Sequence, residues 1–165
     1  MQIKNILVPI DYSTSSYDVF ELGYCLAKLK VAHLHLLHVI DSDYYNQKQH
    51  EIFDDKFIHK TRIENAKEEL QKFKLEVSRS DVKIIEVLIE GDPQKDILNY
   101  ARRNEIDLIV IASHGWTNLP HMVIGNIADK VLKQSEVPVV CIKSNLPVIK
   151  SREMRRHGFA ENWVE

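Results

Sequence analysis

The sequence contains little cysteine, glycine or proline, and it has no long hydrophobic run. Its 165 residues include two cysteines, five glycines and five prolines, too few for a disulfide scaffold or a fibre. Cys25 and Cys141 lie in apolar stretches with neither CxxC nor zinc-ligand spacing, which predicts reduced thiols within the core. The N-terminal apolar stretch is interrupted by Pro9 and is too short for a signal-peptide core or a membrane span. We therefore expect a cytoplasmic protein without membrane insertion.

Charge of neither sign is in excess. The 22 Lys and Arg residues and the 24 Asp and Glu residues give a formal net charge of -2. The chain thus lacks the basic field that dominates binding to nucleic acid, so we expect no nucleic-acid partner. A hydrophobic content of 44% and a charged content of 28% are typical of one globular domain with a buried core.

Strand and helix patterns alternate along the chain. Apolar, β-branched runs predict strands over residues 3–10, 33–40, 82–89, 107–111 and 138–143. The first helix is predicted to bury Val19, Leu22, Leu26 and Leu29, and the second Ile63, Ala66, Leu70, Phe73 and Val77. Asp92 before Pro93 predicts the start of the third helix, and Asn126 is predicted to cap the fourth, which runs to about residue 135.

This alternation predicts an α/β fold with a parallel sheet covered by helices on both faces, because parallel strands need crossover connections. The pattern ends at Lys143. We expect one domain over residues 1–143 and a C-terminal extension over residues 144–165.

Two strand ends indicate a ligand site, since ligands of open α/β sheets bind beyond the carboxyl ends of the strands. The first strand ends in Pro9, Ile10 and Asp11. The fourth leads into a loop that has Gly115 near its start and Gly125 where the last helix begins. Backbone N–H groups and the positive end of a helix dipole favour phosphate at such a loop, although glycines so spaced also occur as simple turns.

Three blocks of the sequence resemble the universal stress protein family: VPIDYS at 8–13, LLHV at 36–39 and ASHGWTNLPHMVIGNIADKVLKQSEVPVVCIK at 112–143. The resemblance covers residues 1 to about 143. It implies a five-stranded parallel sheet of order 3-2-1-4-5 and, in one branch of the family, ATP bound at a G-x2-G-x9-G-(S/T) loop. Here Ala112 replaces the first glycine and Asn126 replaces the serine or threonine, while Gly115 and Gly125 keep the spacing.

The resemblance also assigns residues to an adenine nucleotide, ATP or AMP, bound alone or with Mg²⁺. Asp11 would meet the ribose or the adenine edge, and Val39 would contact adenine through its backbone. The full predicted set comprises Pro9, Ile10, Asp11, Val39, Ile111, Ala112, Gly115, Gly125, Asn126, Ile127 and Ala128. For three of these a structural role is the alternative: Asp11 as a cap of the first helix, Val39 as core, and Ala128 as helix packing.

Histidines and aromatic residues near these positions have two interpretations each. His114 and His121 either assist a phosphate or a metal or are solvated loop residues, and Tyr12 and Trp116 either cover the nucleotide or cover local core. His33, His35 and His38 do not predict a metal site, because side chains alternate along a strand and His38 would point away from the other two.

The sequence thus predicts an adenine-nucleotide-binding regulatory protein of the stress response, with no catalytic residue and at most slow ATP hydrolysis. The alternative is a nucleotide-free dimeric stress protein that acts through protein contacts. Enzymes of the same broad fold that adenylate substrates carry HIGH or SGGxDS motifs, where this chain has SHGW and PIDYSTSS. We also expect a homodimer through residues 137–143, because an apolar edge strand exposes unpaired N–H and C=O groups. The extension would then either lie across the dimer, with Phe159 and Trp163 supplying apolar area, or remain disordered.

Overall fold

The computed structural model describes residues 2–42, 55–77, 80–115 and 124–143, and the predicted C-terminal extension lies outside these ranges. The strands are β1 (Asn5–Ile10), β2 (His33–Asp41), β3 (Ile84–Gly91), β4 (Leu108–Ala112) and β5 (Val139–Ile142). The helices are α1 (Thr14–Lys30), α3 (Asp55–Val77), α4 (Pro93–Arg103) and α5 (Asn126–Gln134). Of the described helices, none is long and apolar enough to cross a membrane.

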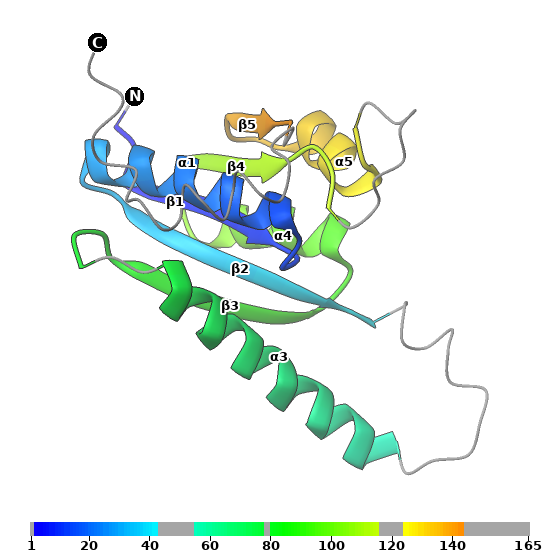
Figure 1. The fold of residues 1–165 in the computed structure, drawn as a ribbon. Coiled ribbons are helices and arrows are strands. Elements are labelled where there is room, and N and C mark those ends of the chain that lie inside the picture. The colour runs from blue at the N-terminus through cyan, green and yellow to red at the C-terminus, as the bar shows by residue number, and fades with distance from the viewer. Residues whose placement is uncertain (1, 43–54, 78–79, 116–123, 144–165) are drawn as a thin grey trace.

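The strands form one parallel sheet in the order β3-β2-β1-β4-β5, which confirms the predicted fold and topology. Successive side chains of a strand point to opposite faces, so the sheet has a core on each side. Helices α1 and α3 cover one face, and α4 and α5 cover the other (Figure 1). The crossovers reverse direction at β1, so the carboxyl ends of β1 and β4 flank the position where open sheets bind ligands.

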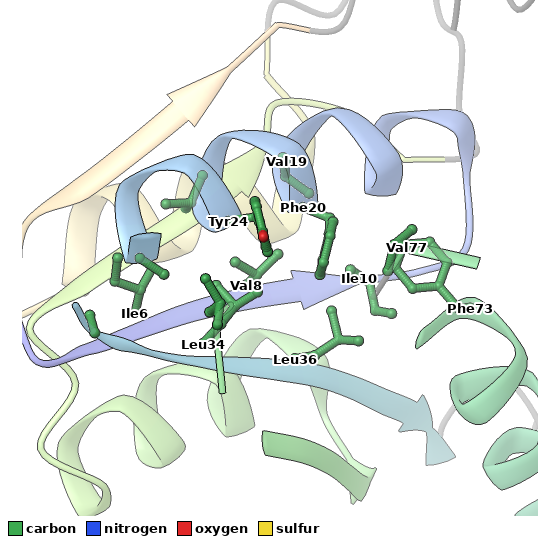
Figure 2. Close-up of a cluster of buried hydrophobic side chains, with 14 of the residues drawn as sticks. Ile6, Val8, Ile10, Val19, Phe20, Tyr24, Leu34, Leu36, Phe73 and Val77 are labelled. Carbon is green, nitrogen blue, oxygen red and sulfur yellow. The ribbon is translucent and has the colours of Figure 1, made fainter. Parts of the chain in front are cut away.

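Helix α1 packs on the sheet through a stripe rotated from the predicted one: Val19 is buried as predicted, and Leu22 and Leu26 are half-buried against the core. Its buried apolar positions are Val19, Phe20, Gly23, Tyr24 and Ala27, whereas Leu29 of the predicted stripe is 74% exposed. Gly23 explains this rotation, because a Cβ there would lie 2.5 Å from Cγ2 of Val8. The helix can therefore approach β1 closely only along this line, and the Phe20 and Tyr24 rings fill the core between α1 and the sheet (Figure 2).

The same rotation leaves Cys25 exposed, so the prediction of a core thiol is wrong for that residue. Cys141, in β5, is half-buried against the core on the α4 and α5 side. Burial raises the pKa of the Cys141 thiol. The stripe predicted for α3 is largely confirmed: Ala66, Leu70, Phe73 and Val77 are buried, and Ile63 is half-buried.

Helices α4 and α5 begin in different ways. Asp92 is the N-cap of α4, and its Oδ1 accepts a hydrogen bond from the Gln94 N–H at 2.8 Å, as predicted. A hydrogen bond to Lys95 holds the pKa of the Asp92 carboxyl below its usual range. The N-cap of α5 is Gly125, not Asn126, and among the residues that the structure describes no side chain caps this helix. Asn126 is already helical, because the extended backbone that a cap requires falls on Gly125 (φ -74°, ψ 157°).

Replacing Val31 with glycine is expected to raise the free energy of unfolding by about 1 kcal/mol. Val31 ends α1 in the left-handed conformation (φ 55°, ψ 44°), which is costly for a β-branched residue and favourable for glycine. Its side chain is 93% exposed, so little packing is lost. Urea unfolding of the wild type, Val31→Gly and Val31→Ala measures the effect. An equal change in the glycine and alanine variants would contradict this explanation.

Candidate functional site

A cleft of about 510 Å³ opens at the carboxyl ends of β1, β2 and β4, between the beginnings of α4 and α5. Its volume lies within the range of roughly 300–1,000 Å³ that is usual for small-molecule sites. The structure brings every residue of the predicted set to its wall: Pro9, Ile10, Asp11, Val39, Ile111, Ala112, Gly115, Gly125, Asn126, Ile127 and Ala128. Residues far apart in the sequence therefore line one cavity at the switch point of the sheet.

Asp11 links the end of β1 to the start of α1. Its Oδ1 accepts hydrogen bonds from the Ser13 N–H at 3.0 Å and the Ser16 hydroxyl at 2.8 Å, and its own N–H donates to Ser16 Oγ at 3.0 Å. Ser13, and not Asp11, is the N-cap of α1. The Oδ2 atom faces the opposite wall, where a Cβ added to Gly115 would overlap it. Asp11 therefore stabilises the turn with one oxygen while it lines the cleft.

Hydrogen bonds at Ser113 position the beginning of α5. The Ser113 carbonyl accepts from the Gly125 N–H at 2.7 Å, which closes the base of the glycine loop. The Ser113 N–H donates to the Ile142 carbonyl at 2.8 Å, which ties the end of β4 to the end of β5. Since Ser113 is buried, the N-terminus of α5 is fixed beside the carboxyl end of β4.

The first turn of α5 presents backbone donors to the cleft. The first hydrogen bond of the helix is donated by the Asp129 N–H to the Gly125 carbonyl at 2.9 Å. The N–H groups of Asn126, Ile127 and Ala128 precede this bond, no side chain of the described residues caps them, and all three residues line the cleft. The positive end of the helix dipole therefore faces the cavity, an arrangement that suits an anion.

The replacement of the first glycine of the family's loop motif by Ala112 introduces no backbone strain. Ala112 is the last residue of β4. Among the described non-glycine residues only Tyr12, Val31 and Glu105 have a positive φ, so the φ of Ala112 is not positive. Its methyl group is therefore compatible with the strand conformation.

Strand β2 extends past the end of β1. Pairing of β1 with β2 ends at Ile10 and His38, whereas pairing of β2 with β3 continues to Asp41 and Gly91. Beyond His38, β2 thus has no β1 residue paired with it. Val39 and Asp41 belong to this part of β2, and both line the cleft. A peptide N–H and C=O on this side are the kind of donor and acceptor that the edge of a base needs.

Several lining residues are absent from the predicted set: Ser16, Val19, Leu37, His38, Asp41, Pro93, Gln94, Ile97, Ser113 and His114. Most belong to β2 and to the start of α4. The Asp92-Pro93 helix start was the sequence signal that could have placed α4 at the cleft, since helices after parallel strands begin at the carboxyl edge of the sheet.

The histidines and Tyr12 have distinct surroundings. His38 lines the cleft, its Nδ1–H donates to the Ile10 carbonyl at 3.0 Å, and burial lowers its pKa although that bond opposes the effect. Tyr12 packs against the His38 ring (centroids 4.4 Å apart) and against Phe73 of α3, and burial raises its pKa. Tyr12 therefore covers core, which is the second of its two predicted interpretations.

His35 lies on the opposite face of β2 from His38. Its Nδ1 accepts from the Tyr100 hydroxyl at 2.8 Å, and burial lowers its pKa.

In the cleft, His114 Nδ1 is 2.9 Å from Ser113 Oγ. His121 and Trp116, the other loop residues considered from the sequence, lie outside the described residues.

The described wall of the cleft carries carboxylates and histidines but no lysine or arginine. Within the same described part of the chain, no three His, Cys, Asp or Glu side chains are grouped so that they could hold a metal ion. Binding of a phosphate here would therefore depend on backbone N–H groups and the α5 dipole.

Comparison with known proteins gives a family match over most of the chain. The model of the Universal stress protein family matches residues 2–143. Universal stress protein MJ0577 of Methanocaldococcus jannaschii is 29% identical over 154 residues, which cover 85% of this chain and 94% of that protein. Universal stress protein YxiE of Bacillus subtilis is 29% identical over 146 residues, covering 85% of this chain and 99% of that protein.

Solved structures share the fold. The structure of the M. jannaschii protein superposes with a TM-score of 0.78 at 26% identity, covering 89% of this chain and all of that chain (100%). A universal stress protein from Archaeoglobus fulgidus, solved in complex with dAMP, superposes with a TM-score of 0.60 at 21% identity and covers 87% of this chain and 100% of that chain.

Proposed function

The chain belongs to the universal stress protein family, and from this premise we propose that it is a regulatory protein of the stress response that binds an adenine nucleotide, ATP or AMP. The proposal concerns the cleft at the carboxyl ends of β1 and β4. The observation that carries it is the uncapped first turn of α5, whose N–H groups at Asn126, Ile127 and Ala128 border a cavity large enough for a nucleotide.

The two ends of the cleft suit different parts of a nucleotide. The α5 end offers backbone donors and a positive dipole to phosphate oxygens. The β2 end places the apolar side chains of Leu37, Val39 and Ile97 on its wall, beside His38, Asp41 and Gln94, and these apolar surfaces suit a base. Asp11 and Gly115 lie between them, where a ribose would sit. An A. fulgidus protein of the same fold was solved in complex with dAMP, which supports an adenine nucleotide as the class of ligand.

Mg²⁺ fits this proposal as an ion that arrives with the nucleotide. The described wall has no basic side chain to neutralise a triphosphate, and it has no cluster of metal-ligating side chains. The residues present therefore bind phosphate through N–H groups, while Mg²⁺ would supply the positive charge that ATP needs.

Thermal unfolding with and without ligand tests the proposal. A ligand at 100 times its Kd adds about 2.7 kcal/mol of stability, so millimolar ATP or AMP with Mg²⁺ is expected to raise the Tm by several degrees. Mass spectrometry of the purified protein after acid release identifies any nucleotide that it already carries. An unchanged Tm together with no released nucleotide would favour the nucleotide-free dimer instead.

We expect negligible ATP hydrolysis. Asp11 Oδ1 bonds Ser13 and Ser16, and His114 Nδ1 lies against Ser113 Oγ, which gives both side chains a structural role at the ends of β1 and β4. A phosphate-release assay with Mg²⁺ and ATP measures this. Turnover of about 1 s⁻¹, the low end for ordinary enzymes, that is lost in Gly125→Val would establish an enzyme instead.

We further propose that the protein is a homodimer joined through residues 137–143. Strand β5 lies at the edge of the sheet, and its residues Val139–Ile142 are all half-buried and apolar. A cytoplasmic location and a division into a domain over 1–143 and an extension over 144–165 complete the proposal.

A further inference from the structure

Tyr12 has a backbone conformation that is unusual for a residue with a side chain. Its φ is 61°, in the left-handed region that glycine adopts freely and that a Cβ disfavours. It stands between Asp11, which lines the cleft, and Ser13, the N-cap of α1. A strained residue beside a ligand site persists only where its surroundings hold it in place.

The Tyr12 ring is held by two other elements. Its centroid lies 4.4 Å from that of His38 on β2 and 6.1 Å from that of Phe73 on α3. Its hydroxyl oxygen lies 3.5 Å from the carbonyl oxygen of Ala66, which also belongs to α3. Packing against β2 and α3 therefore offsets the cost of the left-handed backbone.

The Tyr12 backbone determines where the Asp11 carboxylate lies. Asp11 Oδ1 accepts from the Ser13 N–H at 3.0 Å, and this bond closes a ring across Tyr12. The other oxygen of the same carboxylate, Oδ2, faces Gly115 on the opposite wall of the cleft. A change of φ at Tyr12 would open the ring and move the carboxylate on the cleft wall.

We propose that Tyr12 is a positioning residue of the nucleotide cleft: its ring, held between β2 and α3, fixes the turn that places the Asp11 carboxylate. The inference rests on the proposed function and deepens it. Tyr12 is not one of the described residues that line the cleft, so its effect on a ligand passes through Asp11.

Truncation of Tyr12 in two ways tests the role of the backbone. Tyr12→Ala removes the ring but keeps a Cβ that disfavours the turn, so ATP binding measured by calorimetry is expected to weaken at least tenfold. Tyr12→Gly also removes the ring, but glycine accepts a positive φ and should bind ATP about fivefold more tightly than the alanine variant. A role in core packing alone predicts no advantage for glycine. Tyr12→Phe keeps the ring and should bind ATP as the wild type does.

Tyr17→Ala is the matched control. The Tyr17 ring also packs on Phe73, with the centroids 4.7 Å apart, but Tyr17 is helical and is not among the described residues of the cleft wall. This variant should lose stability, as Tyr12→Ala does, and keep the ATP affinity of the wild type.

A double-mutant cycle with Asp11→Ala tests whether Tyr12 acts through Asp11. Asp11→Ala should itself weaken ATP binding. Once the carboxylate is absent, Tyr12→Ala should cause at most about a twofold further loss. If circular dichroism shows that the alanine variant does not fold, Tyr12→Leu, which keeps apolar volume beside Phe73, replaces it in both backgrounds.

A wild-type ATP affinity in Tyr12→Ala, or a glycine variant that binds no better than the alanine variant, would overturn the role of Tyr12 and leave the proposed function standing. A loss of about tenfold that persists in the Asp11→Ala background would also overturn it, because the damage would then reach the ligand by another route. A wild-type protein that binds neither ATP nor AMP would overturn the proposed function and this inference with it.

Discussion

Replacing Asn126 with aspartate is expected to weaken ATP binding at least tenfold, about 1.4 kcal/mol. Asn126 is exposed at the first position of α5, where its N–H and side chain border the cleft. A negative charge about 5 Å from a phosphate costs roughly 3 kcal/mol at an effective dielectric constant of about 20, before salt reduces it. The same charge stabilises the free protein, because an acidic side chain at a helix N-terminus is favourable. Affinity and stability should therefore change in opposite directions.

Calorimetry with ATP, AMP and adenosine checks this prediction. The loss should be largest for ATP, smaller for AMP and near zero for adenosine, because only the phosphates approach α5. Gln134→Glu adds the same charge to the other end of the helix and should leave all three affinities unchanged. Equal losses for ATP and adenosine in Asn126→Asp would contradict the assignment of this helix start to phosphate.

Gly125→Val is an independent, steric test of the same helix start. The backbone of Gly125 suits any residue, but a Cβ would lie 3.2 Å from the Ser113 carbonyl oxygen and 3.9 Å from the His114 Cα. Valine must therefore displace the loop that positions α5, and at least a tenfold loss of ATP affinity is expected.

The positions of the ligand-site residues could be predicted because they depend on topology more than on side-chain packing. Strand-helix alternation predicts a parallel sheet, and residues at the carboxyl ends of strands converge wherever the strand order reverses. Asp11 and Gly125, 114 positions apart in the sequence, therefore line the same cleft. Gln94 was missed because the Asp92-Pro93 start places the beginning of α4 at the carboxyl edge of the sheet but does not show which strands it lies beside.

The orientation of α1 could not be predicted, because the helix carries two overlapping apolar stripes. Periodicity favours Leu22 and Leu26 as readily as Phe20 and Tyr24. The choice depends on the close approach of Gly23 to Val8, a tertiary contact that no spacing within the helix reveals. The cap of α5 was misassigned for a similar reason: asparagine has the better capping preference, but the bond from the Gly125 N–H to Ser113 fixes where the helix begins.

The structure identifies the residues of β5 that an edge-to-edge dimer would use. The Pro138 carbonyl accepts from Ile109 of β4, and the Ile142 carbonyl accepts from Ser113. Because the backbone groups of successive residues alternate in direction, those of Val140 also face β4, and those of Val139 and Cys141 face away from the sheet. A proline at Val140 would therefore damage the sheet of one protomer, so the position that tests pairing between protomers is Cys141.

If the protein is the homodimer proposed above, replacing Cys141 with proline is expected to convert it into a monomer at tens of micromolar protein. The substitution removes the outward N–H of Cys141 in each protomer, and two lost hydrogen bonds of about 1 kcal/mol each weaken association roughly thirtyfold. Proline is tolerated where an edge-strand N–H faces solvent, so the monomer should remain folded. Cys141→Ala removes the thiol but keeps the N–H, and this matched control should remain a dimer. Light scattering gives the mass and circular dichroism the fold. A wild-type chain that is already a monomer, or a Cys141→Pro variant that still pairs, would refute the β5 interface.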